Sequence, residues 1–81
     1  MAIDRHEVAR VMREISVLLQ LKGESTYKVR AYDTAALRLE ELSPEVFEKL
    51  VREKRLKDEV AGIGESLQLK IVTLVETGKL P

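Results

Sequence analysis

Hydrophobic residues recur every three or four positions along most of this chain, and that spacing predicts helices. A first helix is predicted over residues 5–22. Asp4 followed by Glu7 is typical of a helix start with a capping box, and Gly23 after Lys22 is typical of a helix end. Its expected buried positions are Val8, Val11, Met12, Ile15, Leu18 and Leu19.

Two further stripes predict a second helix over 27–41 and a third over 44–53. Ser25 or Thr26 can cap the second helix, and Ser43 before Pro44 is a strong start signal for the third. The expected buried positions of the second are Val29, Tyr32, Ala35, Ala36 and Leu39. Those of the third are Val46, Phe47, Leu50 and Val51.

The last third of the chain predicts a short helix over about 55–60 and a longer one over about 65–76, which Gly78 ends. No segment alternates apolar and polar residues as a half-buried strand does. The expected fold class is therefore all-α, a compact bundle of four to five short helices.

The two helices near the end of the chain are separated by Gly62, Ile63 and Gly64, within VAGIGESLQLKI (60–71). A dinucleotide loop would need a third glycine, where Leu67 stands, and a preceding strand. Two interpretations remain. One is a tight turn between helices. The other is a helix-hairpin-helix over about 55–76, in which Ile63 plugs into the core and backbone N–H groups at the start of the last helix bind a DNA phosphate. Such contacts position a duplex without reading its sequence.

Composition excludes some classes of protein and disfavours others. The 81 residues suffice for one domain, and the absence of cysteine excludes disulfides and thiolate metal sites. No apolar run reaches the ~20 residues of a membrane span, so we expect no membrane partner and a cytoplasmic protein, nucleoid-associated if prokaryotic. Fourteen cationic residues balance fourteen acidic ones, so total charge gives no support to nucleic-acid binding. The one cationic cluster, interpreted as a solvated helix end, is Arg52, Lys54, Arg55 and Lys57.

Three segments together are more specific than the glycine pair: GESTYKVRAYDTAALRLEEL (23–42), AGIGESLQLKI (61–71) and ETGKL (76–80). In this order and spacing the chain, from about Asp4 to Leu80, resembles the amino-terminal domain of X-family DNA polymerases, the DNA polymerase beta group. The resemblance implies a single monomeric helical domain of a larger polymerase, whose other domains carry the polymerase active site. It also implies binding to the 5′-phosphate side of gapped or nicked DNA, in DNA base excision repair.

The resemblance assigns roles to individual residues. Lys28 matches a ligand of the 5′-phosphate, Tyr32 matches a tyrosine that lines a lyase pocket, and Arg30 could assist with phosphates. Tyr27 and Lys79 are weaker candidates for DNA contacts. At the hairpin, the implied DNA contacts are Gly62, Ile63, Gly64, Glu65 and Ser66. No cofactor is required, but a monovalent cation, Na⁺ or K⁺, is implied on the backbone carbonyls of Asp58, Val60 and Ile63.

Some family members use this domain as a lyase on abasic sugars, and the resemblance assigns the Schiff-base nucleophile to Lys70. Periodicity places Lys70 roughly 65° from the centre of the Leu67–Ile71–Leu74 stripe, where an amine is partly shielded from water. The alternative is a lysine that snorkels at the edge of the core.

The chain also departs from the family pattern. Asp33 and Thr34 replace two cations, Ser66 replaces a second phosphate-binding lysine, and Glu65 adds negative charge at the hairpin. These changes weaken the lyase hypothesis more than the binding hypothesis, because hairpin binding depends on backbone donors. A third hypothesis is a helical protein-interaction module that has lost DNA binding, with exposed Leu37 and Leu69 as its surface.

Overall fold

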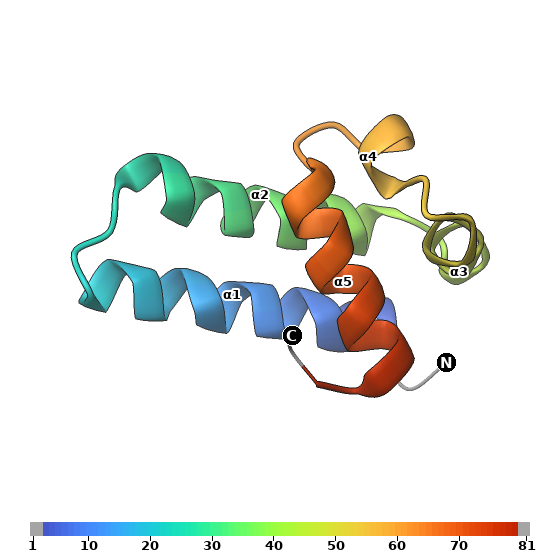
Figure 1. The fold of residues 1–81 in the computed structure, drawn as a ribbon, viewed down its shortest axis with the longest axis horizontal. Coiled ribbons are helices and arrows are strands. Elements are labelled where there is room, and N and C mark those ends of the chain that lie inside the picture. Colours follow the sequence, from blue (N-terminus) through green and yellow to red (C-terminus); the bar gives the residue numbers. More distant parts are fainter. Residues whose placement is uncertain (1–2, 80–81) are drawn as a thin grey trace.

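A computed structural model describes residues 3–79, which contain five helices and no strand (Figure 1). The all-α prediction is confirmed, and every predicted helix end lies within one residue of the observed one. The helices are α1 (Arg5–Leu21), α2 (Thr26–Glu41), α3 (Pro44–Glu53), α4 (Leu56–Glu59) and α5 (Glu65–Thr77). Leu80, at the end of the resemblance, lies outside the described residues.

α1 and α2 form a long antiparallel pair, and α5 lies across both of them (Figure 1). α3 and α4 sit at one end of this pair, next to the start of α5. This arrangement brings the hairpin between α4 and α5 over the middle of α2. None of the helices within residues 3–79 has the length and apolar character needed to cross a membrane.

Three of the helices begin with a side-chain cap, as predicted. Asp4 accepts the Glu7 N–H at 2.9 Å, Ser25 accepts the Lys28 N–H at 3.3 Å, and Ser43 accepts the Val46 N–H at 3.2 Å. Each cap satisfies one of the N–H groups that a helix start leaves without a partner. The Glu7 carboxylate does not complete a capping box, since it pairs with Arg10 instead.

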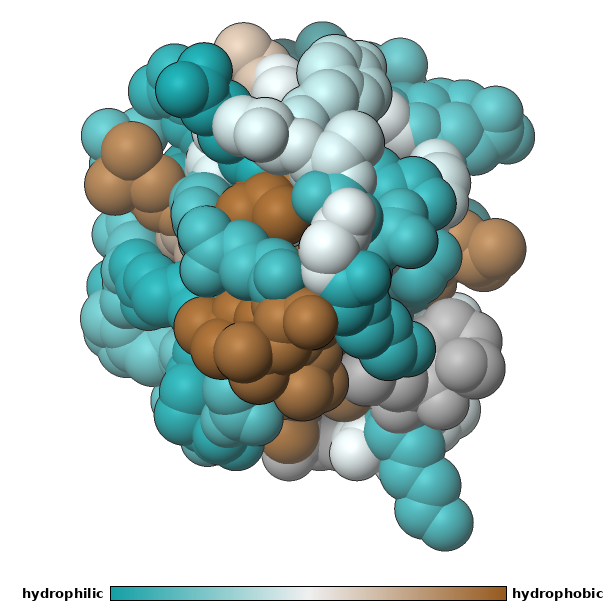
Figure 2. Space-filling model, turned by 90° about the vertical axis from the view of Figure 1, so that its left-hand side faces the viewer, coloured by the Kyte–Doolittle hydropathy of each residue, from teal (hydrophilic) through white to brown (hydrophobic). Residues whose placement is uncertain are grey.

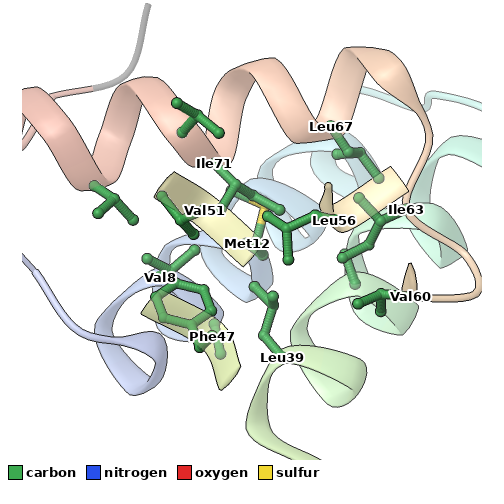
Figure 3. Packing of buried hydrophobic residues seen from close by; sticks show 14 of the residues in the cluster. Val8, Met12, Leu39, Phe47, Val51, Leu56, Val60, Ile63, Leu67 and Ile71 are labelled. Atoms are coloured by element: carbon green, nitrogen blue, oxygen red, sulfur yellow. The ribbon is translucent and has the colours of Figure 1, made fainter. Parts of the chain in front are cut away.

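The core is built where all five helices meet, and the hairpin contributes to it directly (Figure 3). Ile63 is only 3% exposed and points into the cluster beside Leu56 and Leu67, so the prediction that it plugs the turn into the core is confirmed. The side chains labelled in Figure 3 are Val8, Met12, Leu39, Phe47, Val51, Leu56, Val60, Ile63, Leu67 and Ile71.

Two predicted core positions are wrong. Leu18 is 56% exposed and Val46 is 44% exposed. Each lies roughly 100–120° around its helix from the centre of the buried face, too far to reach the core. Apolar atoms gather at the end of the molecule where α1 ends and α2 begins (Figure 2), where Val17, Leu18 and Leu21 are exposed.

Candidate nucleic-acid interface

The hairpin is a tight connection held by buried side chains. α4 is a single turn, and the chain reverses through residues 60–64 before α5 begins at Glu65. Leu56 and Val60 are buried at the two ends of α4, and Ile63 anchors the turn itself. The Ile63 N–H donates to the Val60 carbonyl at 3.2 Å. The turn is therefore fixed on the core rather than free in solvent.

Gly62 is required by the fold for two reasons. Its φ is 89°, a left-handed conformation that side chains disfavour. A Cβ at this position would also stand 2.9 Å from the Thr34 Cγ2 atom of α2. The tight-turn interpretation of the sequence is thus correct for this first glycine.

Gly64 has neither reason. Its backbone is extended, with φ −92° and ψ −175°, and an added Cβ would meet nothing within 4 Å. It is also the N-cap of α5, which consequently begins without a side-chain cap, unlike α1, α2 and α3. The fold itself does not explain this glycine, whereas the close approach of an external group to the backbone does.

The start of α5 leaves three N–H groups, those of Glu65, Ser66 and Leu67, without an acceptor among residues 3–79. We call these three groups the α5 donors. They lie at the positive end of the helix dipole, and no Cβ at Gly64 shields them. Such a helix start binds anions such as phosphate.

The side chains around the α5 donors are mixed in charge. Glu65 and Ser66 are exposed, and Lys70 is half-buried one turn further along the helix. The Lys70 Nζ atom lies 3.5 Å from the Ser66 Oγ atom. A cation is therefore present one turn from the α5 donors, while Glu65 opposes it at the helix start.

Of the three main contacts predicted on α2, which are Lys28, Arg30 and Tyr32, Arg30 shares a surface with the hairpin. It lines a shallow hollow between α2 and the turn, formed by Thr26, Tyr27, Arg30, Ala31, Thr34 and Gly62. Tyr27, given less weight from the sequence, belongs to this hollow and is 85% exposed. The signal was present in the sequence as an aromatic and an arginine three residues apart on one helix face.

Lys28 and Tyr32 lie elsewhere on α2. Two positions apart on a helix corresponds to about 160° of separation, so Lys28 and Arg30 point to nearly opposite sides. The Lys28 ammonium is 3.3 Å from the Glu24 carboxylate, in an exposed ion pair. Tyr32 packs half-buried against the core, which is compatible with its predicted role.

The carbonyl groups predicted to hold a monovalent cation have suitable chemistry. The Val60 carbonyl accepts the Ile63 N–H, and those of Asp58 and Ile63 accept no backbone hydrogen bond within the described residues. Carbonyl oxygens are hard ligands that suit such an ion. Among residues 3–79, no three or more acidic or histidine side chains lie close enough together to hold a metal ion.

The cationic cluster of residues 52–57 is solvated, as interpreted from the sequence. Its four cationic side chains are exposed. The Arg55 guanidinium forms ion pairs with two neighbouring carboxylates, 2.6 Å from that of Glu59 and 3.4 Å from that of Glu53. Exposed pairs of this kind contribute little to stability.

Comparison with known proteins agrees with this geometry. A search of the curated proteins finds no relative of the chain. Residues 3–80, nearly its whole length, match the family model described as helix-hairpin-helix domain. This match implies DNA binding without sequence specificity, which backbone donors at a helix start provide. The chain belongs to the helix-hairpin-helix domain family.

Proposed function

We propose that this domain binds the 5′-phosphate side of gapped or nicked DNA and positions it for an X-family repair polymerase of which it is one part. The resemblance of residues 23–42, 61–71 and 76–80 to the amino-terminal domain of those polymerases supports the proposal. The membership of the helix-hairpin-helix family supports its DNA-binding component.

The observation that carries the proposal is the start of α5. Gly64 has no structural need to be glycine, and the α5 donors have no acceptor among residues 3–79. A DNA phosphate that approaches over Gly64 would accept hydrogen bonds from these donors and gain from the helix dipole. Na⁺ or K⁺ on the carbonyls of Asp58, Val60 and Ile63 would supply positive charge next to the same phosphate.

The charge balance sets the expected strength of binding. The chain has no net charge, so the domain neutralises few phosphates and releases few counterions. Arg30, which lines the hollow beside Gly62, and Lys70, one turn from the α5 donors, are cations placed to contact the strand that these donors hold. We therefore expect weak binding with a shallow dependence on salt concentration.

The test is a fluorescence titration at low salt with four DNAs of equal length. These are a gap with a 5′-phosphate, the same gap with a 5′-hydroxyl, a nick, and an intact duplex. The phosphorylated gap is expected to bind most tightly, and its affinity is expected not to depend on sequence. No preference over intact duplex would reject gap recognition but leave general DNA binding standing.

Gly64→Ser tests the hairpin itself. The serine hydroxyl would cap α5 and occupy the α5 donors, so stability should stay equal or rise by a few tenths of a kcal/mol. The same capping competes with phosphate, so affinity for DNA should fall about tenfold, the effect of one or two charge-assisted hydrogen bonds. Unchanged affinity in a stable Gly64→Ser variant would show that DNA does not use these donors.

A second candidate activity is 5′-deoxyribose phosphate lyase. In this reaction the Lys70 amine adds to the C1′ aldehyde of an abasic sugar, and loss of water gives a Schiff base. Loss of a C2′ proton to solvent then forms the C2′=C3′ double bond and breaks the C3′–O3′ bond, so that the DNA strand leaves with a 5′-phosphate. Water hydrolyses the Schiff base, which releases the unsaturated sugar phosphate and regenerates the Lys70 amine. The half-burial of Lys70, one turn from the α5 donors, favours this candidate.

Borohydride trapping on an abasic, gapped DNA tests the lyase. A covalent adduct that disappears in Lys70→Ala and persists in Lys49→Ala, a change at an exposed lysine of α3, would support Lys70 as the nucleophile. No adduct with the native chain would reject the activity. A mass that rises with concentration, without DNA binding, would instead favour the interaction module, whose surface would include exposed Leu37 and Leu69.

A further inference from the structure

The first helix of the hairpin has no side-chain cap of its own. α4 has four residues, and its N-cap, Arg55, provides no side-chain hydrogen bond. A single turn is not stable as an isolated helix, so its orientation has to come from contacts with other elements. The burial of Leu56 and Val60 fixes its distance from the core, but apolar burial has little directional preference.

The missing cap of α4 is supplied from α5. The Gln68 side-chain oxygen accepts the Lys57 N–H in the first turn of α4, at 2.9 Å. Gln68 is only 8% exposed, and apart from Ser16 it is the only polar residue buried within residues 3–79. Burial of a polar side chain costs folding free energy unless the side chain is hydrogen-bonded. The bond from the Lys57 N–H offsets this cost for Gln68.

The backbone of Gln68 holds the other side of the turn. Its N–H donates to the Gly64 carbonyl at 2.9 Å, the first hydrogen bond of α5. One residue thus connects the start of α4 with the N-cap of α5. The backbone bond lies within α5, whereas the side-chain bond to Lys57 crosses to α4 and restricts rotation of α5 relative to α4.

We propose that Gln68 is a positioning residue of the DNA-binding hairpin, which holds the α5 donors in the orientation that a phosphate requires. This inference rests on the proposed function. Gln68 is a positioning residue rather than a DNA contact, because it is only 8% exposed and its side-chain oxygen accepts the Lys57 N–H. Hydrogen bonds weaken steeply with misalignment, so a small rotation of α5 would cost affinity without unfolding the domain.

The first test needs no DNA. Gln68→Met keeps the length and most of the volume of the side chain but removes the acceptor. Amide exchange at Lys57 should accelerate by about tenfold, as expected for the loss of one hydrogen bond. Gln68→Glu, which retains an acceptor oxygen, should restore slow exchange. Gln20→Met, the same change at an exposed position of α1, is the control and should leave Lys57 unaffected.

The second test measures affinity for gapped DNA in the same variants. Gln68→Met, which changes no charge, should weaken binding by roughly three- to tenfold while helix content stays native, because the α5 donors lose alignment. Gln20→Met should bind as the native chain does. Native-like Lys57 exchange or native-like affinity in Gln68→Met would overturn the positioning role. A native chain that binds no DNA would overturn the proposed function with it, even where Lys57 exchange responds as expected.

Discussion

Gly62 lies so close to Thr34 that a Cβ at position 62 would stand 2.9 Å from the threonine Cγ2 atom. This contact seats the hairpin directly on α2. The left-handed backbone of Gly62 turns the chain at the same point. The fold therefore requires glycine at position 62. It does not require glycine at position 64, where the missing side chain leaves the start of α5 open to an external group.

Gly62→Ala should accordingly destabilise the domain by about 1–3 kcal/mol, because the alanine combines a disfavoured φ with a steric clash. Urea denaturation measures this loss. The double variant Gly62→Ala/Thr34→Ala should regain only the part of the lost stability that comes from the clash, because the disfavoured φ remains. Gly64→Ala is the matched control and should cost at most about 1 kcal/mol, the effect of a poorer N-cap. Equal losses for the two glycines would contradict this division of roles.

Much of the fold could be predicted because the signals are local. Helix ends depend on caps such as Asp4, Ser25 and Ser43, and the sequence shows these directly. The hairpin, too, was recognisable from two glycines around an apolar residue. The predictions of burial at Leu18 and Val46 were wrong because periodicity shows the centre of a buried helix face but not how far around the helix that face extends.

The finer features of the site depend on tertiary contacts and could not be predicted. The sequence presents Gly62 and Gly64 as equivalent, and only the position of α2 distinguishes them. In the sequence Gln68 is indistinguishable from an ordinary polar residue of α5, because its hydrogen-bond partner Lys57 belongs to another helix. The separation of Lys28 from Arg30, by contrast, follows from helix geometry and could have been foreseen.

Lys54 provides a prediction about stability. It is the C-cap of α3 with φ 56° and ψ 46°, a left-handed conformation that glycine usually occupies. A side chain there costs roughly 1–2 kcal/mol, partly offset by the extra flexibility that glycine gives the unfolded chain. Lys54→Gly should therefore stabilise the domain by about 0.5–1 kcal/mol, which thermal unfolding would detect as a rise of a few degrees.

The control for this change is Lys49→Gly, at an exposed position inside α3. There the backbone is already helical, so glycine should destabilise by about 1 kcal/mol. A loss of stability in both variants would mean that the left-handed geometry of Lys54 carries no strain.

The Arg13–Glu40 pair provides a prediction about pH. The hydrogen bond from Arg13 holds the pKa of Glu40 below its usual value of 4.5, with a smaller contribution from His6. A carboxylate with a lowered folded pKa stabilises the fold above its unfolded pKa, and this contribution is lost as pH falls through the folded value. The pair joins α1 to α2, so its loss affects the main helix pair.

Glu40→Gln should thus be less stable than the native chain above about pH 5, and the difference should shrink as pH falls below about 4. Urea denaturation between pH 3 and 7 measures it. Glu48→Gln, at an exposed position of α3, is the control for the loss of one carboxylate. A difference that grows toward low pH would contradict the assigned sign.

Ser66 offers a test of what limits DNA binding. It is exposed in the first turn of α5, next to the α5 donors and one turn before Lys70. Ser66→Lys would restore the cation that the resemblance expects there, at a cost of about 0.3–1 kcal/mol from the helix dipole. If the lysine contacts one further phosphate, the slope of log affinity against log salt should steepen by about 0.9. Binding at low salt should strengthen several-fold.

The control separates a local contact from a general charge effect. Gln20→Lys adds the same charge at an exposed position near the end of α1, away from the hairpin. It should change affinity slightly and leave the salt slope almost as in the native chain, because charges beyond about 10 Å are largely screened. If both variants gain equally, DNA does not approach over the start of α5, and the hairpin would lose its assignment as the binding surface. If Ser66→Lys alone gains, the neutral charge of this domain, rather than its geometry, is what keeps native binding weak.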